Sequence, residues 1–416
     1  MGLKGKKLKN TLRATKDRRK SMDCKVFGVK FDKSKFSTEK KNYLNRLFNE
    51  AKWLYNSILG DQDIFLYNTK CKTVDVLNKD KKWENREFEA ISSQMKQGVG
   101  KRIIDSIVGL SRRKKNGHKV GRLKFKSEVN SIPLKQANVT YKIVNDKYIK
   151  LQGFKKPFRV KGLHQIPVGA ELANANLVRK AGDLYLKITC FVQKEEKAKT
   201  DNVVGLDFGI ETNVTTSDGE KLNFYLPETK GVKKASRKFN KRKKGSRRKF
   251  KAKINLQKKY NKLNNQKKDI KNKIVSKLVK ENDIVAIQDE SLAEWHKSKL
   301  CSKKVQHSIM GGIILGLKQH PETLIVVDKY FPSTQLCPKC EAKNKHTLDQ
   351  RTYHCPCGYS CDRDIHGARN ILNEGMKQLG TERIKPMLVE LTTSERSPSD
   401  KSKVDCVETR SLYALA

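Results

Sequence analysis

The chain has 416 residues, which is enough for two or three domains with their own hydrophobic cores. Its 91 lysines and arginines outnumber 44 acidic residues, and the formal net charge is +47. Because this excess covers most of the length, it excludes a neutral protein with one basic tail, and we expect a nucleic-acid partner bound through its phosphates.

The N-terminal half predicts a β module with a helical insertion. Residues 22–31 alternate in character and indicate a strand, and strand pairs are expected around Asn145–Asp146 and Gly182–Asp183. Apolar residues recur at helical spacing over 38–59, with Gly60 as a stop, and again over 88–107. A change of character at 196–202 marks a domain boundary.

After residue 202 the chain alternates between strands and helices. Residues 202–216 predict a β-hairpin, and 284–287 and 324–327 are typical of buried strands. The stretch 230–273 holds 21 lysines and arginines and a single acid. From Phe250 onward its apolar stripe favours an ordered helix with a basic face for phosphate, whereas the segment before Phe250 is open to a solvated helix or a disordered segment.

Three acidic residues stand beside apolar segments far apart in the chain. Asp207 follows VVGL, Glu290 ends IVAIQDE, and Asp364 opens a helix that Asp362 can cap. Asp289 rivals Glu290, because adjacent residues of a strand point to opposite faces. Singly, each position is ordinary turn or cap chemistry. Jointly, three carboxylates can hold two Mg²⁺ ions roughly 3.5–4 Å apart for phosphodiester hydrolysis.

A group of cysteines predicts one structural zinc ion. Two close pairs of thiols separated by a short polar loop can surround a tetrahedral ion, and so small an insert needs the metal to fold. The second pair has one intervening residue rather than two, so His354 or Cys361 is open as a substitute ligand. The expected ligands are Cys337, Cys340, Cys355 and Cys357.

The same cysteines indicate the cellular compartment in which the protein is expected. Four of the ten are packed within residues 337–357, a pattern that fits a metal site in a reducing compartment better than a disulfide framework. The basic N-terminus lacks the apolar segment that a secretory signal requires. No apolar run in the sequence approaches the roughly 20 residues that a membrane span needs. We expect a cytoplasmic protein of the prokaryotic cytosol or nucleoid, without a membrane partner.

Three motifs resemble those of the TnpB family of transposon-encoded, RNA-guided nucleases, which are relatives of type V CRISPR effectors. They are VVGLDFGIETN, AIQDESLAEWHKS and STQLCPKC…YHCPCGYSCDRDIHGARNIL, and the resemblance covers about 200–375. The N-terminal half looks like the family's wedge barrel and inserted recognition lobe on pattern alone.

The resemblance implies a multidomain α+β architecture. In it, an N-terminal wedge-like β-barrel precedes an RNase-H-like (RuvC) α/β nuclease domain with a zinc-ribbon insertion. The implied divisions are the wedge at 1–198 with a helical recognition insertion at about 37–115, a first RuvC segment at 199–330, the ribbon at 331–360, a second RuvC segment at 361–376, and a polar, disordered tail at 377–416.

The family's metal-binding acids fall on Asp207, Glu290 and Asp364. Its usual Glu-x-Leu pattern is met from Glu290 onward, which decides against Asp289. The chain departs from the family at His366–Gly367, where Asn-Ala is common, and in the short C-x-C spacing. The implied activity is Mg²⁺-dependent cutting of double-stranded DNA paired with a guide RNA, beside a short flanking motif and through a single RuvC site.

Other functions stay open at this point. A miniature type V CRISPR effector would share the same motifs and differ in gene neighbourhood. A guided DNA-binding repressor would not cleave, but such proteins are expected to lose acids of the triad. A zinc-ribbon nucleic-acid-binding protein without catalysis is disfavoured by the order of the motifs.

Overall fold

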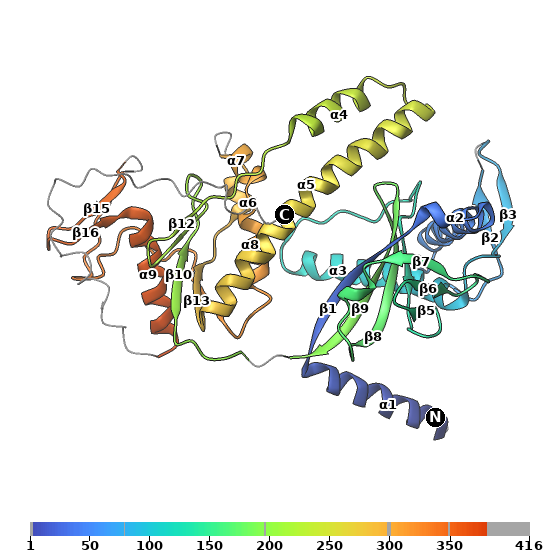
Figure 1. Cartoon of the computed structure of the whole chain (residues 1–416), viewed down its shortest axis with the longest axis horizontal. Coiled ribbons are helices and arrows are strands. Elements are labelled where there is room, and N and C mark those ends of the chain that lie inside the picture. Colours follow the sequence, from blue (N-terminus) through green and yellow to red (C-terminus); the bar gives the residue numbers. More distant parts are fainter. Residues whose placement is uncertain (1–2, 79, 195–196, 298–300, 348–349, 381–416) are drawn as a thin grey trace. The chain divides into compact units, whose positions relative to one another are not determined.

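The computed structural model describes residues 3–78, 80–194, 197–297, 301–347 and 350–380 (Figure 1). Contacts divide the chain into two compact units. The first comprises Met1–Glu196 and Lys230–Lys262, and the second comprises Lys197–Thr229 and Leu263–Ala416. The chain first passes between them at residue 197, inside the segment where the sequence changes character.

An antiparallel sheet of seven strands forms the centre of the first unit, in the order β4-β8-β9-β1-β7-β6-β5. The strands are β1 (Met22–Phe31), β4 (Ser131–Leu134), β5 (Tyr141–Asn145), β6 (Tyr148–Leu151), β7 (Phe158–Lys161), β8 (Glu171–Lys180) and β9 (Asp183–Gln193). The outermost strands, β4 and β5, are consecutive in the chain, and a bridge joins Ala137 to Tyr141 between them. The sheet is therefore a near-closed β-barrel around an apolar core.

The turns of both expected hairpins are displaced by one residue. Asn145 still pairs with Tyr148, so the first turn lies at 146–147. In the second hairpin Lys180 pairs with Asp183, and the turn residues are Ala181 and Gly182. Both have left-handed backbone angles (φ 52° and 78°), as a two-residue turn between twisted strands requires.

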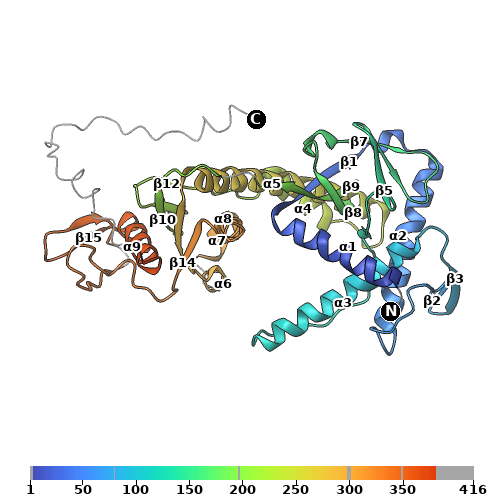
Figure 2. The ribbon, with the colours of Figure 1, turned by 90° about the horizontal axis from the view of Figure 1, so that it is seen from below.

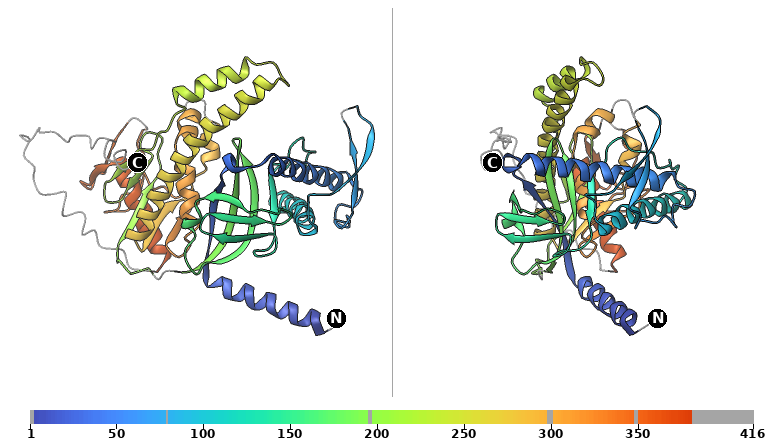
Figure 3. Two further views of the ribbon diagram at one scale, coloured as in Figure 1. Left: turned by 45° about the vertical axis from the view of Figure 1, so that its right-hand side comes forward. Right: turned by 90° about the vertical axis from the view of Figure 1, so that its right-hand side faces the viewer.

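Two long helices interrupt the barrel strands. The helix α2 (Thr38–Gly60) matches the predicted span, and the Ser37 side chain caps it by accepting from the Lys40 amide at 3.2 Å. The helix α3 (Ser93–Lys115) begins later than the predicted start near Phe88, because Ser92 is its cap. An unpredicted hairpin, β2 (Thr73–Leu77) and β3 (Trp83–Glu87), precedes it (Figure 3). Short 3₁₀ turns lie at Lys33–Lys35 and Leu163–Gln165.

The basic segment forms two helices, α4 (Lys230–Asn240) and α5 (Arg247–Glu281) (Figure 2). The predicted helix is confirmed and starts three residues before Phe250. Val232 and Ala235 of α4 are buried, so this segment is an ordered helix with a covered apolar face. A further basic helix, α1 (Leu3–Lys20), was not predicted. In the described ranges, no helix combines the length and apolarity that crossing a membrane requires.

The second unit is built on a mixed sheet in the order β12-β11-β10-β13-β14. Its strands are β10 (Val203–Asp207), β11 (Val214–Thr216), β12 (Lys221–Leu222), β13 (Ile284–Gln288) and β14 (Leu324–Val327). Strands β10, β13 and β14 are parallel. Their near-continuous apolar runs are typical of strands covered on both faces. Besides the part of α5 from Leu263 onward, its helices are α6 (Leu292–Trp295), α7 (Ser302–His307), α8 (Met310–Leu317) and α9 (Arg363–Gln378).

Alternate residues of β10 face different cores. Val204 and Leu206 pack in a cluster that includes residues of α5, α7 and α8, and the opposite face packs against α9. A side chain at Gly205 would place its Cβ 2.1 Å from the Ala368 carbonyl oxygen, so only glycine permits this approach. The helix α9 continues to Gln378, and residues 381–416 of the predicted tail lie outside the described residues.

Candidate metal sites

Asp207 and Glu290 lie at one edge of the five-stranded sheet. Asp207 is the last residue of β10, and Glu290 follows β13 by two residues. The strands are parallel with Leu206 opposite Ile287, so both acids leave the sheet at its carboxyl-terminal edge. In open parallel sheets, this edge is where ligands bind.

Asp364 reaches the same edge from α9. Asp362 caps this helix, as predicted, by accepting from the amides of Asp364 (3.0 Å) and Ile365 (3.3 Å). One turn further on, a Cβ on Gly367 would meet the Asp207 Oδ2 atom at 3.2 Å. The small residue at position 367 therefore lets the first turns of α9 pass directly beside the Asp207 carboxylate.

The electrostatics at Asp207 reflect both of the other acids. Burial, followed by the negative charges of Asp364 and Glu290, raises the pKa of Asp207 to about 7, although Arg363 opposes the shift. Burial also raises the pKa of Glu290, against the attraction of Lys329. An ionised Asp207 is thus costly unless a cation lies beside it. The acids are more widely spaced than the cysteines below, since no acidic group among the described residues brings three ligand atoms within 4.8 Å.

Asp289 faces away from this site. Its side chain is exposed and accepts a hydrogen bond from Lys318 at 3.0 Å, whereas its neighbour Glu290 is partly buried. This is the alternation expected of adjacent residues at a strand end. Glu290 therefore stays the predicted metal-binding acid of this motif.

The raised pKa of Asp207 makes a prediction about stability. Asp207 holds its proton more tightly in the folded chain than an ordinary aspartate does in the unfolded chain. The free energy of unfolding therefore falls as the pH rises from about 4 to about 7. We expect Asp207→Asn to increase the free energy of unfolding of metal-free protein at pH 8 by up to about 4 kcal/mol, because a shift of about three pKa units corresponds to about 1.4 kcal/mol per unit. The gain should shrink toward pH 4. Urea unfolding in a chelator at several pH values measures it, with Asp289→Asn as the matched control; equal stability at pH 8 would contradict it.

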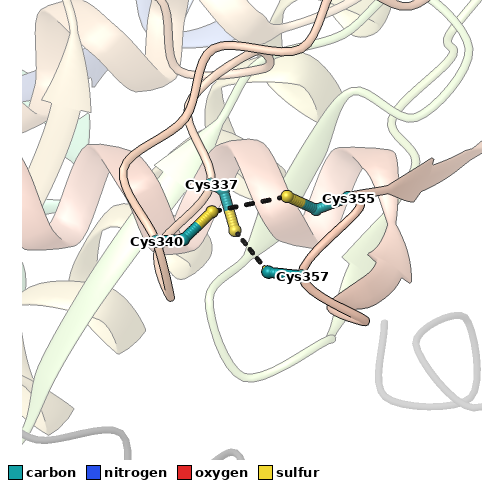
Figure 4. A group of neighbouring side chains, drawn as sticks. All are labelled: Cys337, Cys340, Cys355 and Cys357. Carbon is teal, nitrogen blue, oxygen red and sulfur yellow. Dashed lines mark hydrogen bonds between the residues drawn. The ribbon is translucent and has the colours of Figure 1, made fainter.

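The second candidate site is a cluster of four thiols (Figure 4). The sulfurs of Cys337 and Cys357 are 3.6 Å apart, those of Cys340 and Cys355 are 3.5 Å apart, and all four lie within 4.8 Å. The Cys357 backbone N–H and the neighbouring thiols lower the pKa of Cys355 to about 6, so a thiolate is available near neutral pH. The arrangement has the donor set of a structural zinc site.

The two substitute ligands left open by the sequence are not in this cluster. His354 is exposed at the end of β15 (Thr352–His354). Cys361, in β16 (Ser360–Asp362), instead accepts from an Arg369 side-chain nitrogen at 3.7 Å. The structure therefore assembles four thiols without either of them.

Two residues of α9 to which the sequence gave no role hold the cysteine segment against this helix (Figure 2). His366 is fully buried and stacks on Tyr353 of β15 with ring centroids 3.8 Å apart. Asn370 donates to the carbonyls of Ser333 (2.6 Å) and Leu336 (2.7 Å) and lies 3.1 Å from His366 Nε2. Burial lowers the pKa of His366 to about 4, so the ring packs as a neutral group. His366 and Asn370 are four residues apart, which places them on one face of a helix. This spacing on a buried stripe is the signal in the sequence that could have revealed them.

Comparison with known proteins adds two family models. The model described as "Probable transposase" (OrfB_IS605) matches residues 187–294, which contain Asp207 and Glu290. The model described as "Cas12f1-like, TNB domain" matches residues 317–371, which contain the four clustered cysteines and Asp364. Residues 187–294 are thus similar to a transposase family, and residues 317–371 to the TNB domain of Cas12f1-like proteins.

Individual relatives agree with the family models. A Streptomyces pristinaespiralis protein named "Putative RNA-guided DNA endonuclease" is 27% identical over 300 residues, which span 62% of this chain and 75% of the relative. These matches confirm the resemblance to the TnpB family that the motifs predicted. A solved Cas12f1–sgRNA–target DNA complex aligns at 14% identity with a TM-score of 0.48, over 81% of this chain and 83% of that one.

Proposed function

We propose that this protein is an RNA-guided DNA endonuclease whose chemistry takes place at Asp207, Glu290 and Asp364. The observation that carries the proposal is that β10, β13 and α9 bring the three acids to one edge of the sheet, where burial and the other two acids raise the pKa of Asp207 to about 7. Such a group is matched to a bound cation and is out of place in a merely structural sheet. The name of the Streptomyces relative supports the guided activity.

The five-stranded sheet with α9 is, in this proposal, the RuvC nuclease domain. The near-closed barrel is the wedge, and α2 and α3 belong to the recognition insertion. Two Mg²⁺ ions, when bound, would neutralise the phosphate and activate water. Asp207 and Glu290 would hold them from adjacent parallel strands, and Asp364 from the first turn of α9. A single site of this kind would cut the two DNA strands in succession.

The four clustered thiols would hold one structural Zn²⁺ in a zinc-ribbon insertion. Cys337 and Cys340 come from one loop and Cys355 and Cys357 from the β15–β16 hairpin, so the ion would join two segments with little core between them. Their role is to keep the ribbon folded on α9.

The partners in this proposal are a guide RNA and double-stranded target DNA in the prokaryotic cytosol or nucleoid. The net charge of +47 needs a large polyanion, and the basic helices α4 and α5 supply phosphate contacts. A miniature CRISPR effector would use the same geometry. A non-cutting repressor is disfavoured because the three acids are present and share one edge.

Guide dependence is the test of this function. We expect Mg²⁺-dependent cutting only when the copurifying RNA carries a segment complementary to the target, and only beside one short flanking motif. Protein with its bound RNA should be assayed on a plasmid library with randomised flanks, and cut ends sequenced. The control is the same complex with a scrambled guide. Cutting of arbitrary DNA by RNA-free protein would show an ordinary nuclease instead.

A further inference from the structure

The turn that follows β14 presents an exposed aromatic ring near the carboxyl-terminal edge of the five-stranded sheet. This edge, which carries Asp207 and Glu290, is called the acid edge below. In this turn, Asp328–Phe331, the Phe331 amide donates to the Asp328 carbonyl (3.2 Å) and the Tyr330 amide donates to Asp328 Oδ1 (2.7 Å). Tyr330 is 83% exposed, although a large ring normally gains stability by burial. Its exposure has no packing explanation within the second unit.

A buried glutamine fixes this turn to the strand that leads to Glu290. Gln288 is the last residue of β13, and its Nε2 lies 3.1 Å, 3.1 Å and 2.7 Å from the carbonyl oxygens of Asp328, Lys329 and Phe331. Its Oε1 accepts from the Ser333 hydroxyl at 3.0 Å. The turn is therefore held in one position relative to Glu290, which is two residues further along the chain.

The lysine of the turn lies between two carboxylates. Lys329 Nζ donates to both oxygens of Glu294, at 3.0 Å and 2.9 Å, and its charge also attracts Glu290. Glu294 thus holds the ammonium group beside a candidate metal ligand. An ammonium group has three N–H donors and Glu294 accepts with two oxygens, so a donor of Lys329 is left for a phosphate.

We propose that the Asp328–Phe331 turn positions one unpaired nucleotide of the DNA at the acid edge, with Tyr330 stacked on its base and Lys329 on its phosphate. The inference rests on the proposed nuclease function. A base inside a duplex has both faces covered by its neighbours. A projecting ring can therefore stack only on a base that has left the duplex stack. A protein partner fits less well, because the ring stands beside a lysine and several acids, not within an apolar patch.

Single-turnover cutting by the guided complex tests the proposal. In wild type, scanning one abasic site along the DNA should reveal a position where loss of the base slows cutting. Stacking is worth about 1–3 kcal/mol per base, so Tyr330→Ala should slow cutting about 5- to 150-fold. In this variant, the slowing caused by the abasic site at that position (the abasic penalty) should vanish. Tyr330→Phe keeps the stacking ring and should retain the penalty.

The matched controls separate stacking from a general loss of function. Tyr225→Ala removes another exposed tyrosine of the second unit and should leave the position-specific penalty in place. Lys329→Gln should slow cutting without removing the penalty, since it alters the phosphate contact and leaves the ring. An abasic penalty that persists unchanged in Tyr330→Ala would overturn the proposal.

A measurement without cutting distinguishes failure of this inference from failure of the nuclease function. Single-stranded DNA containing 2-aminopurine should be quenched on binding to wild-type protein and to Tyr330→Phe, but not to Tyr330→Ala. If guided cutting is absent and this difference is observed, the function is wrong and the stacking site is right. If cutting occurs and quenching is the same in all three proteins, the stacking site is wrong.

Discussion

Alanine at Asp207, Glu290 or Asp364 is expected to lower the rate of guided DNA cleavage by about 10³-fold or more, because removing one member of a unit disables the whole. Affinity for RNA and DNA should stay within a few-fold of wild type, since it comes from phosphate contacts dispersed over the basic surface. Cleavage rates and binding by filter retention, measured on the same preparations, check both expectations.

Asp289→Ala provides the matched control for this series. It removes a neighbouring carboxylate that is exposed and paired with Lys318, so cleavage should stay close to wild type. The assignment of Glu290 would be wrong if Asp289→Ala lost cleavage while Glu290→Ala kept it. Loss of nucleic-acid binding together with cleavage in all three alanine variants would indicate misfolding.

The second large effect is expected when a cysteine of the four-thiol cluster is replaced. We expect about one Zn²⁺ per chain by elemental analysis, because four thiolates make one tetrahedral site. Binding of structural zinc contributes about 10–16 kcal/mol in small zinc peptides, so Cys337→Ser or Cys355→Ser should unfold the segment around β15 and β16 and lower protein yield. Hydrogen exchange of the β15–β16 amides measures the local unfolding.

Cys361→Ser is the control for the zinc prediction. Cys361 is next to the cluster in sequence but bonds to Arg369 rather than to the four thiols, so its replacement should keep the zinc content. His354→Ala should likewise keep it, because His354 is exposed. Metal-free protein with full stability and full cleavage would rule out a structural zinc site.

The sequence predicted the elements that depend on local pattern. The strand runs 284–287 and 324–327, the helix over 38–59 and the cap at Asp362 all appear at or within one residue of the expected bounds. It also identified the acids at the strand ends. Parallel pairing then determines that Asp207 and Glu290 share one edge.

The sequence could not supply the contacts made over long separations. Ala181 has no intrinsic preference for a left-handed backbone, and only the pairing of β8 with β9 imposes it there. Similarly, the short C-x-C spacing left the fourth member of the cysteine cluster open until the folded loops brought Cys357 to Cys337. The role of Gln288 was hidden because its partners lie 40 or more residues away.

The glycines along α9 and β10 have a wider consequence for how this site tolerates sequence change. A Cβ at Gly205 would collide with the α9 backbone, one at Gly375 would lie 3.0 Å from Ala286 Cβ, and one at Gly367 would press on Asp207. The close approach of α9 to the sheet and to Asp207 thus depends on missing methyl groups. Sequence drift at these positions would alter the arrangement of the three acids while leaving every charged group in place. Uncharged neighbours therefore limit which substitutions the candidate site tolerates.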